Sequence, residues 1–188
     1  MFLDEAAKIV ARNGVAGLSL EQISAEADVS KSLIYKYFDS VTDLLKALRR
    51  RELEALRELR MAAVEKAETY EEMVRGVTHA YLLHIEERGL IIERLQSEPS
   101  IADEHDQANC QRLEAINFLA TRTAKYFDLP LEVAKIAVEV SFYMPGAAGN
   151  CMLRGEVDRA TLEDITVSMI VGAVTQLRND YFARLRKV

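Results

Sequence analysis

The sequence predicts an all-α protein, and three observations support this fold class. Proline and glycine are scarce, at 3 and 8 of the 188 residues. Apolar residues recur at intervals of three and four along the whole chain, which is the periodicity of a helix face. The sequence has no alternating valine-rich run typical of a strand, no repeat and no low-complexity tract. The length allows one or two compact domains with a buried core.

The composition is that of a soluble globular protein, with 49% hydrophobic and 29% charged residues. Charged residues interrupt every long apolar run, so no membrane-spanning helix is predicted. The N-terminus "MFLDEAAKIVARNG" has no basic segment of the kind that opens a signal peptide. Cys110 and Cys151 lack metal or redox spacing and are expected to be reduced thiols. We therefore expect a cytoplasmic protein.

Positive charge is concentrated in one segment of an acidic chain. Residues 29–51 contain six Lys and Arg against two Asp, a local charge of +4, whereas the whole chain carries −6 and the remainder therefore −10. A uniformly acidic protein would not be expected to bind nucleic acid. A basic segment on an acidic body leaves that possibility open.

Capping residues place the helix boundaries in the first quarter of the chain. Ser19 opens a capping-box pattern, and Ser30 is a good N-cap for the next helix. Asp28 lies where a tight turn needs a left-handed residue, which aspartate tolerates. Ser40 and Asp43 repeat the capping pattern before a long helix. The helices expected here cover about residues 2–12, 20–27, 31–38 and 40–68.

Breaks divide the rest of the chain into five further helices. Gly89, Pro99, Gly155 and the segment 128–130 are the residues that end them. Pro145 is expected to kink the helix that contains it. The expected helices cover about residues 70–88, 90–97, 102–127, 131–153 and 159–187.

The stretch "VSKSLIYKYF", residues 29–38, forms a helix too short to bury much. Its expected inner side comprises Leu33, Ile34, Tyr37 and Phe38. Lys31, Ser32, Tyr35 and Lys36 lie on the opposite side or its edge. Lysines, hydroxyls and a phenol can donate to phosphates and reach base edges. A short helix and a tight turn precede this segment, which is a helix-turn-helix arrangement, so we interpret it as a recognition helix for the major groove. The alternative is a packed short helix with a solvated polar side.

Residues 2–51 resemble the DNA-binding domain of the TetR family of bacterial transcriptional regulators. The resemblance rests on "LSLEQIS", on "ADVSKSLIYKYF" and on the "LL" that follows. It implies a helix-turn-helix domain over residues 1–47 and a helical effector-binding and dimerisation domain over residues 48–188. It further implies a ligand-responsive regulator, a repressor that binds a palindromic double-stranded DNA operator as a homodimer and is released by a small molecule.

The resemblance also assigns roles to particular residues. Ser19 would contact a phosphate, Tyr35 and Tyr37 would hydrogen-bond the DNA backbone, and the third helix would face the bases or nearby phosphates. Tyr37 would need its hydroxyl to emerge from an otherwise buried ring. Val41 stands where the family usually has a lysine, so a phosphate anchor is missing, and the chain also lacks the family's basic arm before the first helix. The implied DNA-contacting residues are Ser19, Lys31, Ser32, Tyr35, Lys36, Tyr37 and Thr42.

The last two helices carry more apolar surface than one buried face needs. In the final helix one stripe comprises Leu162, Ile165, Met169, Ala173 and Leu177, and another comprises Val167, Ile170, Val171 and Val174. A helix with a second stripe is either central in the fold or packed against a partner. The small residues of "PGAAGN" in the preceding helix permit close approach. We predict an isologous dimer through these two helices, with a buried monomeric core as the alternative.

Polar side chains inside apolar helix faces mark a candidate effector pocket. The selection is largely apolar and aromatic, which favours a hydrophobic or aromatic effector. The candidate residues are Tyr81, His84, Ile85, Cys110, Leu113, Asn117, Phe142 and Tyr143.

The fourth helix is expected to connect the two parts of the chain mechanically. Its apolar pattern runs from Leu44 to Val64 without a glycine or proline. A ligand in the body could shift this element and so change the position of the recognition helix.

Catalysis is not expected. His79 and His84 are five residues apart and do not share a helix face, and the acids of "DEHD", residues 103–106, are explained by the helix dipole. The sequence has no phosphate loop, nucleophile motif or paired zinc spacing, so no catalytic residue, metal or cofactor is predicted. The alternative to a DNA-binding regulator is an all-helical interaction module whose basic segment contacts an acidic protein or a membrane surface.

Overall fold

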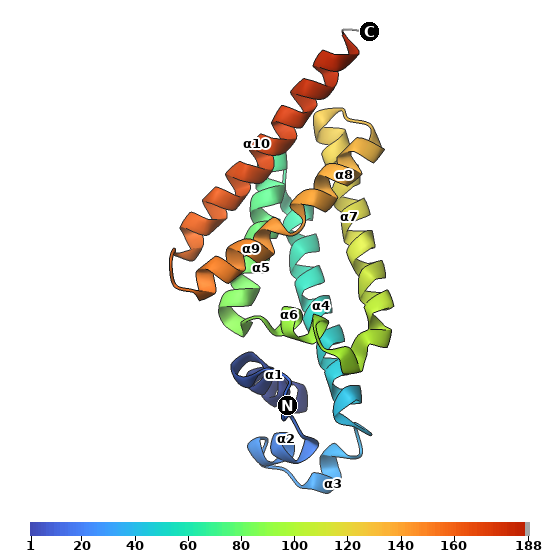
Figure 1. Cartoon of the computed structure of the whole chain (residues 1–188), viewed down its shortest axis with the longest axis vertical. Coiled ribbons are helices and arrows are strands. Elements are labelled where there is room, and N and C mark those ends of the chain that lie inside the picture. The colour runs from blue at the N-terminus through green and yellow to red at the C-terminus, as the bar shows by residue number, and fades with distance from the viewer. Residues whose placement is uncertain (187–188) are drawn as a thin grey trace. The chain divides into compact units, whose positions relative to one another are not determined.

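A computed structural model describes residues 1–186, with the side chains of residues 102–109 and 111 outside the description. The described residues form helices and no strand, which confirms the all-α prediction (Figure 1). None of the described helices is both long enough and apolar enough to cross a bilayer. The helices are α1 (Phe2–Asn13), α2 (Leu20–Glu26), α3 (Lys31–Ile34), α4 (Val41–Lys66), α5 (Tyr70–Arg88), α6 (Ile91–Gln96), the 3-10 helix η1 (Pro99–Glu104), α7 (His105–Phe127), α8 (Leu131–Ser141), α9 (Met144–Leu153) and α10 (Arg159–Leu185).

The chain divides into two compact units whose boundaries fall within long helices. Unit 1 comprises residues 1–58 and 87–108, and unit 2 comprises residues 59–86 and 109–188. Helix α4 contributes its first part to unit 1 and its last part to unit 2. The expected division at residue 47, between a DNA-binding domain and an effector-binding and dimerisation domain, concerns function instead of compactness and stays a prediction.

Unit 1 has its own apolar core. The inward faces of α1 and α2 meet the start of α4, and Ile23, Ile34, Leu44 and Leu48 are completely buried. Helix α6 packs against α1, where Arg94 donates hydrogen bonds to the backbone carbonyls at the end of α1. The carbonyl of Val10 also accepts from the NH of Gly14, so the guanidinium adds to the capping of the C-terminal end of α1.

Most of the expected boundaries in unit 1 are confirmed. Ser19 accepts a 3.1 Å hydrogen bond from the backbone NH of Gln22 and so caps α2. Ser40 accepts one of 3.1 Å from the NH of Asp43. Asp28 has a φ of 53°, the left-handed value expected for the turn. The Gln22 side chain bonds Glu26 instead of returning to the cap, because that carboxylate lies one helical turn away.

The third helix is shorter than predicted. The α-helix ends at Ile34, and Tyr35, Lys36 and Tyr37 form turns in which NH groups also bond carbonyls three residues back. Ser30 occupies the N-cap position, but its hydroxyl lies 3.0 Å from that of Ser32 and does not cap the helix. One α-helical turn is too short to hold its own geometry, so packing of Ile34 and the neighbouring side chains decides the conformation.

Unit 2 contains the remaining apolar clusters. Val64, Tyr70, Met73 and Val74 pack with the inward face of α10, and the rings of Tyr70 and Phe127 meet edge to face with centroids 4.6 Å apart. Smaller clusters centre on Leu82 and on Ile116. The aromatic pair fixes the end of α7 against the start of α5.

The predicted single helix over residues 131–153 is two helices. Helix α8 ends at Ser141 and α9 begins at Met144, with Pro145 in the first turn of α9 (Figure 1). Proline lacks an NH to continue the preceding helix but fits the first turn of the next one. The expected kink at Pro145 is therefore a complete break. Likewise, the expected helix over residues 102–127 begins as η1 and continues as α7 from His105.

Candidate DNA-binding surface and candidate ligand cavity

The polar side chains of the third helix and the following turn lie on the surface of unit 1. Lys31, Ser32, Tyr35, Lys36 and Tyr37 are all exposed. Ser19 and Thr42 are half-buried. All seven residues expected to contact DNA lie near the ends of α2, α3 and α4, and five of them are exposed.

Tyr37 differs from the expectation of a buried ring with an emergent hydroxyl. Its side chain is 66% exposed, and its ring touches only one edge of the core, at a centroid distance of 5.8 Å from Phe2. The turn after Ile34 explains this, since a continuous helix would have carried Tyr37 inward one turn after Leu33. Most of the side chain is consequently available for contact.

Tyr35 is held by an acidic side chain of α2. Its hydroxyl donates a 2.8 Å hydrogen bond to Glu21, and both groups lie at the surface. This bond lowers the pKa of Glu21 and raises the pKa of Tyr35. Lys31 also contributes a favourable charge to Glu21. The candidate DNA-binding surface therefore contains one carboxylate among its lysines and hydroxyls.

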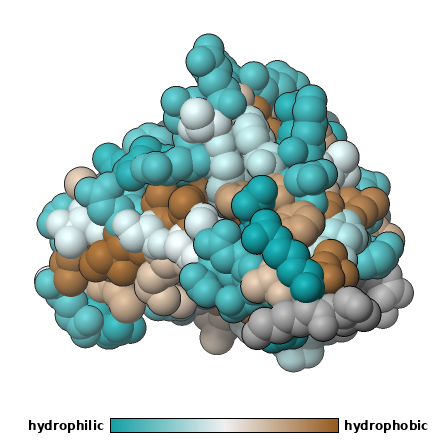
Figure 2. All heavy atoms as spheres, turned by 90° about the horizontal axis from the view of Figure 1, so that it is seen from above, coloured by the Kyte–Doolittle hydropathy of each residue, from teal (hydrophilic) through white to brown (hydrophobic). Residues whose placement is uncertain are grey.

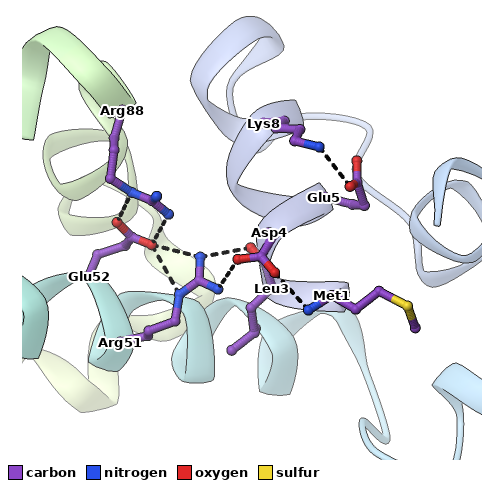
Figure 3. Close-up of polar contacts among 8 residues, drawn as sticks. All are labelled: Met1, Leu3, Asp4, Glu5, Lys8, Arg51, Glu52 and Arg88. Carbon is purple, nitrogen blue, oxygen red and sulfur yellow. Dashed lines mark hydrogen bonds and ion pairs between the residues drawn. The ribbon is translucent and has the colours of Figure 1, made fainter.

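Two of the six cations in the basic segment, Arg49 and Arg51, are buried or engaged by other groups of unit 1. Arg49 is 2% exposed. Arg51 donates to Asp4 at 2.7 Å, to Glu52 at 2.8 Å and to the backbone carbonyl of Leu3 at 3.0 Å (Figure 3). The positive charge of residues 29–51 therefore lies only partly on the surface. On the third helix and the turn that follows it, the exposed cations are Lys31 and Lys36.

Glu52 is the centre of this buried ion network. Its side chain is 2% exposed and accepts hydrogen bonds from Arg88 at 2.5 and 2.7 Å as well as from Arg51 (Figure 3). Burial acts to raise the pKa of Glu52, but the two arginines outweigh it and lower the pKa. The network joins α1, α4 and the end of α5 within unit 1.

Unit 2 contains a cavity that opens to solvent. Helices α4, α5, α7, α8, α9 and α10 all contribute to its wall. Most of the lining is aliphatic or aromatic, and the lining residues include no aspartate or glutamate. The residues with polar groups are Arg60, Tyr70, Thr78, Tyr81, Thr123 and Ser141.

Two of the eight candidate pocket residues line this cavity. They are Tyr81 and Phe142. His84 and Ile85 are buried elsewhere in unit 2, and Ile85 packs against Gly149. Cys110, Leu113, Asn117 and Tyr143 are exposed. Tyr143 accepts a 3.0 Å hydrogen bond from Arg112.

Arg60 and Thr78 were not among the sequence-based candidates, although a pattern in the sequence marks them. Arg60 interrupts an apolar row at Leu56 and Val64, which lie one turn before and after it and are buried. Thr78 lies one turn after the buried Val74. A polar residue inside an apolar row at four-residue spacing points inward, which is the same criterion that selected Tyr81.

Helices α8 and α10 of unit 2 expose apolar stripes. On α8, Ile136 and Val140 are 64% and 69% exposed and lie one turn apart, and Tyr143, in the turn that follows α8, is 61% exposed. On α10, Ile165 and Met169 are 48% and 56% exposed, whereas Val167, Ile170 and Val174 form the core. Of the two stripes predicted for the last helix, the second is therefore buried, and most of the first faces solvent. Hydrophobic residues also appear in brown between hydrophilic ones on the surface in Figure 2.

No group of three or more histidine, cysteine, aspartate or glutamate side chains is placed to hold a metal ion among the residues with described side chains. The "DEHD" side chains lie outside the described set. Cys110 and Cys151 are free thiols.

Residues 2–48 match a family model described as bacterial regulatory proteins of the tetR family. The match covers α1, α2, α3 and the start of α4, which together form the candidate DNA-binding surface. Among curated proteins, none matches the sequence closely enough to count as a relative.

Solved structures share the fold over nearly the whole chain. A TetR-like transcriptional regulator from Rhodococcus sp. RHA1 is 18% identical with a TM-score of 0.71, and 93% of each chain is covered. A TetR-family regulator from Streptomyces coelicolor is 16% identical with a TM-score of 0.69 and 94% coverage of each chain. The fatty acid degradation regulator of Bacillus halodurans is 17% identical with a TM-score of 0.77, covering 91% of this chain and 93% of that one. At these identities the likeness establishes the fold. Together with the family match over residues 2–48, it shows a helix-turn-helix domain of the tetR family in a chain that has the fold of TetR-like transcriptional regulators.

Proposed function

We propose that this protein is a repressor that binds a palindromic DNA operator as a homodimer and releases it when a small molecule occupies the cavity of unit 2. The observation that carries the DNA-binding part is the exposed set of Lys31, Ser32, Tyr35, Lys36 and Tyr37 on a helix-turn-helix that matches the family model. Such a regulator works in the cytoplasm, where its operator is found.

The third helix would enter the major groove. Lys31, Ser32 and Lys36 would meet bases or nearby phosphates, and Tyr35 and Tyr37 would donate to the DNA backbone. In a twofold dimer two such helices would reach successive major grooves about 34 Å apart. Ser19 and Thr42 would add hydroxyl contacts. With Val41 at the position of the family's lysine, the two lysines of the third helix would supply most of the charge.

The apolar stripes of α8 and α10 support a homodimer. Four large apolar side chains with about half or more of their surface in solvent lie on these two helices at helical spacing: Ile136, Val140, Ile165 and Met169. Tyr143, in the turn that follows α8, is also exposed. A stripe of this kind usually marks an interface rather than free surface. A pair of helices that meets its own copy across a twofold axis would cover both stripes at once.

Helix α4 is the proposed connection between ligand and DNA. It is unbroken from Val41 to Lys66, carries Leu44 and Leu48 in the core of unit 1, and contributes Arg60 to the cavity wall in unit 2. A ligand that favours one position of this helix would change the separation of the two recognition helices. By linkage, operator DNA must weaken ligand binding by the same factor by which ligand weakens operator binding.

Selection of bound sequences from random DNA tests the DNA-binding part. The expected result is a palindromic consensus that the dimer protects. Lys36→Ala combined with Tyr35→Phe should weaken binding to that sequence by at least ten-fold, on the basis of about 1 kcal/mol for each lost contact. Lys125→Ala, an exposed lysine of α7, serves as the matched control and should bind as the wild type does. Bound DNA without a consensus would instead indicate a protein that recognises charge alone.

A further inference from the structure

We infer that the cavity of unit 2 binds an organic monoanion with a hydrocarbon body, a carboxylic acid in the natural ligand, whose charged end is held by Arg60 and Thr78. This inference rests on the proposed effector role of the cavity and specifies the chemical class of the effector. Arg60 is the one cation among the described lining residues.

Arg60 brings a positive charge into an apolar wall without a carboxylate to balance it. The lining residues include no acid, and no ion pair joins Arg60 to any carboxylate among the described side chains. Its guanidinium carbon lies 5.8 Å from the centroid of the Phe142 ring, and Tyr81 is the other group that interacts with its charge. Burial lowers the pKa of Arg60, which reflects the loss of water around the charge. A guanidinium in such a place gains most from an anion, because a ring face compensates only part of the lost hydration.

Thr78 places an unused hydrogen-bond donor in the same wall. The residue is 1% exposed, and its hydroxyl oxygen is buried without a hydrogen-bond partner among the described residues. Thr123 and Ser141, by contrast, donate to carbonyls one turn back in their own helices, at 2.9 and 2.8 Å. A buried hydroxyl with no partner is costly, and an acceptor oxygen of a ligand would satisfy it.

These two groups select the ligand's charge. A carboxylate has two oxygens that can accept from a guanidinium fork and from a hydroxyl together. A cationic ligand would meet Arg60 with no acid in the lining to offset the repulsion. The rest of the wall is formed by side chains such as Met73, Val77 and Leu119, which suit a hydrocarbon body. One anionic end and one apolar end together describe a hydrocarbon carboxylate.

A pair of fluorescent probes measures the charge preference directly. Anilinonaphthalene sulfonate and the neutral phenylnaphthylamine share an aromatic body and differ in the anionic group. The quantity to follow is the ratio of their dissociation constants, neutral over anionic. Arg60→Met should lower this ratio about ten-fold, because it removes the charge-assisted contact and keeps an apolar side chain. Thr78→Val should lower it by less, about three-fold.

Arg122→Met is the matched control. Arg122 also lies over a phenylalanine ring, 5.7 Å from the centroid of Phe118, but it does not line the cavity. Arg122→Met should leave the ratio of the two dissociation constants unchanged. This result distinguishes probe bound in the cavity from probe bound at exposed apolar surface. Arg60→Gln replaces Arg60→Met if circular dichroism shows that the methionine variant is misfolded. Octanoate should displace the anionic probe from the wild type at lower concentration than octanamide does.

The outcomes separate this inference from the proposed function. The inference is overturned if Arg60→Met and Arg60→Gln leave the probe ratio unchanged, or if octanoate and octanamide displace the probe equally. Selection of an operator sequence by the same protein would then leave the regulator proposal standing. An Arg60-dependent ratio in a protein that selects no DNA sequence supports the anion site and overturns the regulator.

Discussion

The hydroxyl of Tyr35 donates a 2.8 Å hydrogen bond to the carboxylate of Glu21, which lies in the first turn of α2. The contact joins the two helices of the helix-turn-helix at the surface. The bond favours the ionised form of Glu21 and lowers the pKa of that carboxyl. DNA must therefore approach a surface in which one of the proposed phosphate donors is already engaged by a negative charge.

Glu21→Gln should strengthen DNA binding. The amide oxygen can still accept from Tyr35, but the charge that repels phosphate is removed, so affinity for the selected operator should rise about five-fold at low salt. Fluorescence anisotropy with a labelled duplex measures the change. Glu132→Gln on α8 removes an exposed carboxylate from unit 2 and should have no effect. Weaker binding by Glu21→Gln would mean that Glu21 is needed as an ion to position Tyr35.

Glu52→Gln should destabilise unit 1. The substitution leaves Arg51 and Arg88 facing an uncharged amide, and we expect the free energy of unfolding to fall by about 3 kcal/mol at pH 7. Chemical denaturation followed by circular dichroism measures it. Glu54→Gln is the control, because Glu54 is an exposed partner of Arg57 at 2.8 Å and such pairs contribute little.

The same network predicts a pH dependence. The pKa of Glu52 is lower in the folded protein than in the unfolded chain. Its contribution to stability is therefore present above the unfolded value of about 4.3 and is lost as the pH falls through the lower folded value. The difference in the free energy of unfolding between wild type and Glu52→Gln should be constant from about pH 6 to 8, where Glu52 is ionised in both the folded and the unfolded chain. This difference should shrink in acid. A difference that grew in acid would contradict this assignment.

Gly149→Ala should destabilise unit 2. A Cβ at this position of α9 would clash with Cδ1 of Ile85, whose side chain is 1% exposed and cannot move freely. We expect a loss of about 1–2 kcal/mol, the cost of overpacking less the gain from removing a helical glycine. Adding Ile85→Val removes the clashing methyl and should recover part of the loss.

Gly146→Ala in the same helix provides the comparison. Its Cβ would meet only the Tyr81 hydroxyl, at 3.4 Å, so stability should be unchanged or slightly higher. Equal losses for both glycine variants would show that α9 tolerates no side chain there, independent of Ile85. Thermal unfolding monitored by circular dichroism distinguishes these results.

Val140→Asp combined with Met169→Glu should give a monomer. Both side chains are more than half exposed, so the substitutions cost the isolated chain little, but two charges in an apolar interface would remain unpaired. Light scattering coupled to gel filtration reports the mass. Leu59→Asp places a charge at an exposed leucine of α4 and should remain dimeric. A monomeric wild type would remove the dimer from the proposed function.

Periodicity and capping chemistry were sufficient to predict the all-α fold and most helix ends. Ser19, Asp28 and Ser40 act where the sequence places them, because caps and turns depend on a few neighbouring residues. The end of the third helix was not predictable in this way. A single turn has no stability of its own, and only the packing around Ile34 decides that the helix stops there and leaves Tyr37 outside.

The sequence by itself determined the fold class and a helix-turn-helix that resembles the TetR family, since these follow from local patterns and from a motif confined to residues 2–48. The tertiary structure alone decided which charges are used inside the protein. Arg51 and Arg60 are both cations on α4, yet one joins Asp4 and Glu52 in unit 1 and the other enters an apolar wall in unit 2. The physical reason is that a charge's role depends on its partners and its access to water, and residues distant along the chain supply both.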